Sequence, residues 1–119
     1  MTLVPFDFAQ GRPTPPLKPL VFEVLLALSS EPQHGWSLVR LVQERLAGER
    51  LLPGNFYRTL RRLVADGLIE EAPTKQRAED ERRRYFRLTA RGERVARDEA
   101  RRLQALVVDA RTQKLLRAR

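Results

Sequence analysis

The chain has 119 residues, no cysteine and a formal net charge of +8, with 23 lysines and arginines against 15 aspartates and glutamates. This length fits one domain, and the lack of cysteine excludes disulfides, thiolate catalysis and a cysteine-liganded zinc site. No apolar run approaches the roughly 20 residues that cross a bilayer, and no signal-peptide pattern opens the chain, so the sequence predicts a soluble cytoplasmic protein without a membrane partner.

The positive charge is concentrated in the second part of the chain. Residues 1–52 carry five basic and five acidic side chains, residues 53–88 carry nine and six, and residues 89–119 carry nine and four. A general preference for arginine would raise the charge everywhere, but the first 52 residues are neutral. The distribution favours a polyanionic partner for the second part.

Residues 1–16 hold four of the eight prolines and show no helical periodicity. They predict an irregular N-terminal arm, with Arg12 as its sole basic residue.

Two helices are predicted next. The first begins at Leu17 and ends before Pro32, because proline disfavours helix in the residue before it. The second runs from about His34 to Ala47 and is stopped by Gly48. The positions expected to be buried in these two helices are Leu20, Val21, Val24, Leu25, Leu28, Trp36, Val39, Leu41, Val42 and Leu46.

A third helix is predicted from Pro53 to Asp66, where proline suits the first turn and Gly67 can adopt the left-handed conformation that caps the end. At 100° per residue the helix has an apolar arc and an opposite arc without any acidic residue. The apolar arc contains Phe56, Leu60, Leu63 and Val64, and the opposite arc contains Asn55, Arg58, Arg61, Arg62 and Ala65.

Residues 68–72 and 84–88 predict two short strands joined by the polar loop 73–83. The loop is acidic at residues 79–81, so we assign contact with a polyanion to the arginines that lead into the second strand. These are Arg82, Arg83 and Arg84.

Thr89 is the expected N-cap of a last helix that continues to about Leu116. The helix carries an apolar stripe that a small domain cannot cover, and a second copy of the chain is the simplest cover for it. The stripe contains Val95, Ala96, Ala100, Leu103, Leu106, Val107 and Ala110, and all of these except Ala100 are assigned to a dimer interface.

These elements add up to a mainly α, α+β winged helix-turn-helix fold. Residues 17–88 would form the three-helix core with a two-stranded β-wing, and residues 89–119 would form a long C-terminal dimerisation helix. Four fragments, in this order and at this spacing, resemble the PadR-like family of transcriptional regulators. They are LLALSSEPQHGW (25–36), LPGNFYRTLRRL (52–63), DGLIE (66–70) and RRYFRLTARG (83–92).

The resemblance covers about residues 17–112. It implies a homodimeric regulator that binds a specific palindromic operator in double-stranded DNA, usually as a repressor of its own or neighbouring genes. Some members are released by a small aromatic effector. By position, the resemblance places Tyr57 in the recognition helix and His34 at the turn into the second helix. Leu52 and Asn55 depart from the serine or threonine of many relatives, so the operator sequence does not carry over, and Trp36 replaces a usual tyrosine.

The arginine face of the third helix leads to a mechanism in which Arg58, Arg61 and Arg62 contact guanine edges and phosphates while Asn55 reads adenine. The wing arginines would hold the flanking backbone. Two alternatives remain open at the level of sequence. A winged helix can serve as a protein–protein interaction module without a specific DNA target, and a small nuclease would need a carboxylate cluster, for which only the loop 79–81 is available. The sequence predicts no catalytic residue, cofactor or metal.

Overall fold

The computed structural model describes residues 6–7, 12–13, 16–46, 50–72 and 84–117. Within these residues the α-helices are α1 (Pro19–Leu28), α2 (Gly35–Arg45), α3 (Pro53–Ala65) and α4 (Ala90–Thr112). The short strands are β1 (Phe6–Asp7), β2 (Arg12–Pro13), β3 (Gln33–His34), β4 (Ile69–Glu71) and β5 (Tyr85–Leu88). Among the described residues, β1 pairs with β2, and a separate antiparallel sheet has the strand order β3-β5-β4.

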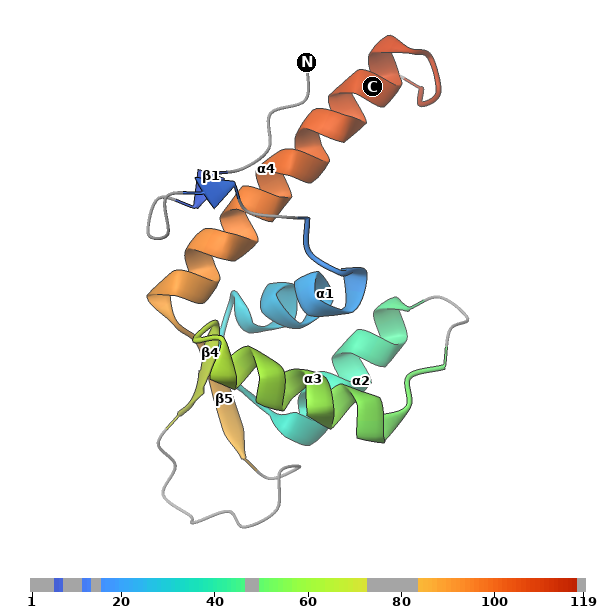
Figure 1. The fold of residues 1–119 in the computed structure, drawn as a ribbon. Coiled ribbons are helices and arrows are strands. Elements are labelled where there is room, and N and C mark those ends of the chain that lie inside the picture. The colour runs from blue at the N-terminus through green and yellow to red at the C-terminus, as the bar shows by residue number, and fades with distance from the viewer. Residues whose placement is uncertain (1–5, 8–11, 14–15, 47–49, 73–83, 118–119) are drawn as a thin grey trace.

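Helices α1, α2 and α3 enclose the core together with one face of the small sheet, and α4 runs away from them (Figure 1). This arrangement confirms the expected α+β winged helix. The core consists of apolar side chains from α1, α2, α3, β4, β5 and the segments that enter α3 and β4, and Val95 and Ala96 of α4 pack against it. Its most deeply buried members are Val24, Leu25, Leu38, Val42, Phe56, Leu60 and Ile69.

The apolar pattern of α2 was assigned incorrectly in three places. Trp36 and Leu41 were expected in the core but are 46% and 37% exposed, whereas Leu38, which was not selected, is fully buried. At 100° per residue Leu38, Val39, Leu41 and Val42 fall on one arc of α2, with Leu41 at its edge, whereas Trp36 falls among Arg40, Gln43 and Glu44. The packing of Leu38 and Val42 in the core fixes the rotation of the helix and turns Trp36 and Leu41 outward. Val64, at the edge of the apolar arc of α3, is likewise 42% exposed.

Two strand regions also differ from expectation. The sequence indicated no strand before α2, yet Gln33 and His34 pair with Phe86 and Tyr85 at the edge of the sheet. The arm expected to be irregular contains the β1–β2 pair, with Phe6 opposite Pro13. Proline and its neighbours favour extended backbone, which can pair even where no periodic pattern marks a strand.

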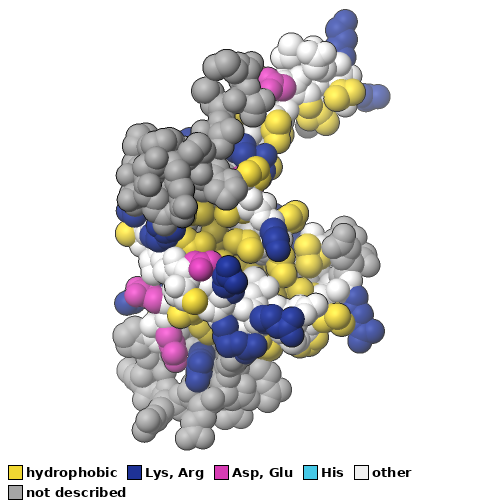
Figure 2. Space-filling model, in the orientation of Figure 1, with side chains coloured by type: hydrophobic (Ala, Val, Ile, Leu, Met, Phe, Trp, Pro, Cys, Tyr) yellow, Lys and Arg dark blue, Asp and Glu magenta, His cyan; other side chains and the backbone are white. Residues whose placement is uncertain are grey.

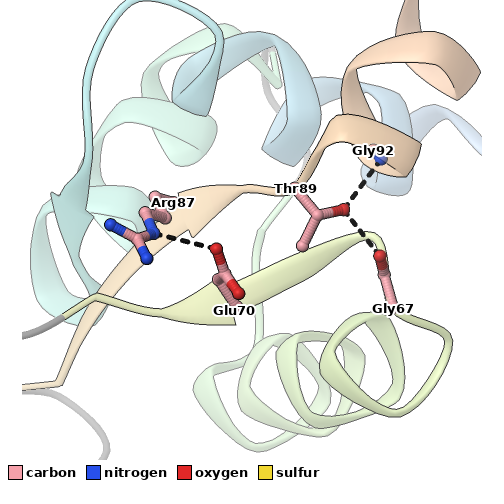
Figure 3. A network of polar contacts seen from close by, with 5 residues as sticks. All are labelled: Gly67, Glu70, Arg87, Thr89 and Gly92. Atoms are coloured by element: carbon pink, nitrogen blue, oxygen red, sulfur yellow. Dashed lines mark hydrogen bonds and ion pairs between the residues drawn. The ribbon is translucent and has the colours of Figure 1, made fainter.

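The junction between α3, β4 and α4 is fixed by specific contacts (Figure 3). Gly67 has φ +75°, so it takes the left-handed conformation that was expected at the end of α3. The hydroxyl of Thr89 accepts a hydrogen bond from the Gly92 N–H at 3.0 Å and donates one to the Gly67 carbonyl oxygen at 2.6 Å. The predicted Thr89 N-cap is therefore confirmed, and α4 ends at Thr112 rather than near Leu116.

Candidate nucleic-acid interface

Helix α3 separates an apolar face from a basic face. Phe56, Leu60 and Leu63 are buried in the core. The opposite face is exposed and carries Asn55, Arg58, Arg61, Arg62 and Ala65. Figure 2 shows Lys and Arg side chains gathered in the lower half of the view, where α3 lies. A helix with this division can stay packed on the domain while it presents cations to a second molecule.

The contacts given for Arg58 and Arg62 are weak and exposed. The Arg62 Nε lies 3.4 Å from the Asp66 carboxylate, and their side chains are 79% and 48% exposed. The Arg58 Nη1 lies 3.5 Å from the Asn55 side-chain oxygen, at the limit of a hydrogen bond. Exposed pairs of this kind contribute about 0–1 kcal/mol. Arg58 and Arg62 can therefore exchange these partners for phosphates or base edges at little cost.

Tyr57 connects α3 to the strands of the wing. Its half-buried ring meets Phe56 edge-on, with centroids 5.8 Å apart. It lines a cavity of about 140 Å³ between α3 and the β4–β5 pair, together with Arg61 of α3 and Arg84, which precedes β5. Glu71 also lines this cavity. The basic face of α3 thus continues across a groove onto the wing.

Arg84 is held at the base of the wing by its backbone. Its carbonyl oxygen accepts a hydrogen bond from the Gly35 N–H at 2.9 Å. Its side-chain Nε is buried and has no hydrogen-bond partner within the described part of the chain. Arg82 and Arg83, the other two arginines assigned to the wing, lie outside the described residues.

His34 lies between α2 and the sheet rather than on the open surface. It precedes the first residue of α2, and its half-buried ring meets Tyr85 at 4.5 Å and 61°. The Trp36 ring stacks on the His34 ring, with centroids 6.0 Å apart and an interplanar angle of 8°. The exposed aromatic residue at this position is therefore Trp36, which the sequence assigned to the core.

The apolar stripe of α4 is divided between two environments. Val95 and Ala96 pack against the core of the winged helix domain, and Leu103 and Ala110 are half-buried. Leu106 and Val107 are 44% and 40% exposed. Figure 2 shows hydrophobic side chains along this projecting part of the molecule. The part of the stripe that remains for another surface is thus its C-terminal half.

The model of the PadR-like family of transcriptional regulators matches residues 24–98. The chain belongs to this family. The match spans the second half of α1, then α2, α3, the sheet and the first turns of α4, and so includes α3 and the wing, which carry the basic surface. The protein is therefore a DNA-binding transcriptional regulator and not an enzyme.

Solved structures agree with this fold. A PadR family transcription regulator from Clostridium difficile is 22% identical, with a TM-score of 0.66 over 82% of this chain and 98% of that one. RV1404 from Mycobacterium tuberculosis is 24% identical, with a TM-score of 0.63 over 85% of this chain and 61% of that one. The adhesin competence repressor from Streptococcus pyogenes is 17% identical, with a TM-score of 0.58 over 85% and 69%. No protein of curated function is recognisably similar in sequence.

A buried carboxylate in α4 was missed at the level of sequence. Glu99 is 4% exposed and accepts hydrogen bonds from the Arg102 Nε and Nη2 at 2.6 and 2.7 Å. It also accepts one from the Leu17 N–H at 3.3 Å. The bond to Glu99 raises the pKa of the Arg102 guanidinium. This PadR-like regulator thus uses Glu99 to join the segment before α1 to α4, outside its nucleic-acid interface.

In the described ranges no helix is long and apolar enough to pass through a membrane.

Proposed function

We propose that this PadR-like regulator is a homodimeric repressor that binds a palindromic operator and acts on its own or neighbouring genes. The observation that carries the proposal is the exposed basic face of α3, which continues over the groove beside Tyr57 to Arg84. A helix of this width fits the major groove of B-DNA, where side chains can reach base edges.

Within this proposal the residues of α3 divide two tasks. Arg58, Arg61 and Arg62 contact guanine edges and phosphates, and Asn55 addresses adenine through its amide. The half-buried Tyr57 and His34 have little freedom to move, so their part is to contact phosphate and to fix the orientation of the neighbouring side chains. Arg84, together with Arg82 and Arg83, holds the backbone that flanks the groove.

Dimerisation rests on the exposed end of the α4 stripe. Leu103, Leu106, Val107 and Ala110 recur at three- and four-residue spacing, so they share one side of the helix. Packing this side against the same side of a second copy would cover the exposed Leu106 and Val107, and it would set two α3 helices about one DNA turn apart. A repressor role is supported by the fold of the Streptococcus pyogenes repressor, and an aromatic effector is proposed from the family resemblance alone.

Selection of bound DNA from a random pool, followed by sedimentation of the complex, tests this proposal. We expect an enriched sequence with two inverted half-sites and a complex that contains two protein chains per site. An enriched sequence without two-fold symmetry would contradict binding by a symmetric homodimer. Failure to retard any DNA at low salt, with a stable complex with another protein isolated from cells, would favour the protein-interaction alternative.

A further inference from the structure

Trp36 ends a row of three aromatic rings that leads from the wing to the surface of α2. Tyr85 and His34 are cross-strand partners in the β5–β3 pair, and their rings meet edge-on at 4.5 Å. The Trp36 ring stacks on His34 with an interplanar angle of 8° and is 46% exposed. The His34 ring, itself packed against Tyr85, therefore holds a large amphipathic side chain in a defined orientation while about half of it faces solvent.

An exposed cation lies one turn further along α2. Arg40 follows Trp36 at i+4, so the two side chains share one side of the helix. Arg40 is exposed, and no hydrogen bond or ion pair is found for it within the described part of the chain. We call Trp36 and Arg40 together the Trp36 face. It combines an exposed indole with a positive charge that forms no ion pair within the described residues, with the acidic Glu44 one turn further along the helix.

The Trp36 face adjoins both parts of the nucleic-acid interface. Gln43, one turn beyond Arg40, accepts a hydrogen bond from the Leu51 N–H at 2.7 Å, so this side of α2 is turned toward the chain that enters α3. Arg45 pairs instead with Glu23 of α1, on another side of the helix. At the other end of α2, the Gly35 N–H binds the Arg84 carbonyl oxygen at the base of the wing.

We propose that the Trp36 face is a further contact surface for DNA, and that it binds the sugar–phosphate backbone beside the groove that α3 enters. Arg40 pairs with a phosphate, and the Trp36 indole packs on a deoxyribose while its N–H donates to a phosphate oxygen. The unpaired Arg40 favours an anionic partner, and continuity with the surface of α3 and Arg84 selects DNA among anions. This inference rests on the proposed DNA-binding function.

The protein offers a specific probe, because Trp36 is its only tryptophan. Acrylamide quenching of the full chain is measured with and without the DNA fragment enriched from the random pool. We expect the quenching constant to fall about twofold or more when DNA covers the indole. Trp36→Phe keeps a ring on His34 but removes the N–H, and we expect it to weaken binding about three- to tenfold.

Arg40→Ala provides a second test. The substitution should leave the fold intact, because the Arg40 side chain is exposed and forms no ion pair within the described residues. Loss of one phosphate contact lowers the slope of log K against log salt by about 0.9. The matched control is Arg111→Ala, which removes an exposed arginine from the last turn of α4, and its slope should equal that of the unaltered protein.

The outcomes separate this inference from the proposed function. DNA binding with an unshielded Trp36 and an unchanged slope for Arg40→Ala would overturn the inference and leave the proposed function standing. If acrylamide quenching of Trp36 falls when the protein concentration is raised without DNA, the Trp36 face binds a second copy of the chain. That result would also overturn the inference. Absence of DNA binding by the unaltered protein would remove the proposed function itself.

Discussion

The hydroxyl of Thr89 joins two elements by donating a 2.6 Å hydrogen bond to the carbonyl oxygen of Gly67. The Thr89 hydroxyl oxygen also accepts a hydrogen bond from the Gly92 N–H at the start of α4, so one side chain caps α4 and satisfies the carbonyl at the end of α3 (Figure 3). The orientation of α4 relative to α3 therefore depends on this contact. In a dimer held by α4, the same contact would influence the separation of the two recognition helices.

Thr89→Ala is the first test of this junction. It removes the cap and leaves the Gly67 oxygen without its partner, and we expect a loss of about 1–2 kcal/mol in the free energy of unfolding. Chemical denaturation followed by circular dichroism measures it. Thr112→Ala is the matched control, because its hydroxyl bonds to the Val108 carbonyl in the exposed last turn of the same helix. Equal losses of unfolding free energy in the two variants would show that the Thr89 contacts stabilise the protein no more than the exposed Thr112 contact does.

The close approach of α4 to β4 gives a second prediction. A Cβ atom on Gly92 would lie 1.9 Å from the backbone oxygen of Leu68, so the backbone itself would have to move. We expect Gly92→Ala to lower the free energy of unfolding by about 1–3 kcal/mol or more, as measured by thermal denaturation. A Cβ on Gly54, in the first turn of α3, would meet nothing within 4 Å. Gly54→Ala should therefore raise stability, by up to about 1 kcal/mol, through helix propensity.

The contrast between α3 and α2 shows what sequence alone can predict. In α3 the apolar and basic residues are segregated, so their spacing identified both the buried Phe56, Leu60 and Leu63 and the exposed arginines. In α2 the same spacing places Leu38 and Val42 on one apolar arc and Trp36 among polar residues, in agreement with the buried Leu38 and the exposed Trp36. The stacking of Trp36 on His34 depends on how α2 meets the sheet, which periodicity does not give.

Contacts between residues distant in sequence account for the other misses. Strand β3 has two residues, too few for a repeating pattern, and it exists through its pairing with Phe86 and Tyr85 some fifty positions later. Glu99 and the exposed Glu93 both stand near arginines in the sequence, and what distinguishes Glu99 is a contact with the Leu17 N–H, 82 positions earlier in the chain.

The arginine face of α3 gives a prediction on DNA. Arg61→Ala should weaken operator binding by about 1–3 kcal/mol and relax the preference at one base position if the side chain reads a base. If Arg61 contacts phosphate instead, affinity should fall equally for all DNA sequences, and the slope of log K against log salt should be lower by about 0.9. Binding is measured by fluorescence anisotropy at several salt concentrations, with Arg111→Ala as control. Unchanged affinity and slope for Arg61→Ala would show that this face does not contact DNA.

The C-terminal half of α4 gives a prediction on assembly. Leu106→Glu places a charge on the exposed apolar side of the helix, and burying an unpaired charge in an interface costs several kcal/mol. We expect the variant to sediment as a monomer. Val64→Glu is the control, because Val64 is 42% exposed on α3 while Leu106 is 44% exposed on α4. A dimer that persists in Leu106→Glu would mean that another surface joins the copies.

Glu99 gives the last prediction, on the link between the segment before α1 and α4. Its carboxylate is 4% exposed and is bound by Arg102 and the Leu17 N–H, so a neutral glutamine would lose the charge-assisted bonds and leave the mostly buried Arg102 without its anion. We expect Glu99→Gln to cost about 1–3 kcal/mol in the free energy of unfolding. It should also speed hydrogen exchange at the Leu17 amide, because that amide loses a strong acceptor.

Glu93→Gln is the control on the same helix, since Glu93 pairs with Arg97 in an exposed i,i+4 contact worth about 0.3–0.5 kcal/mol. Equal effects of the two substitutions on stability and on the Leu17 amide would show that Glu99 does not hold the segment before α1 against α4.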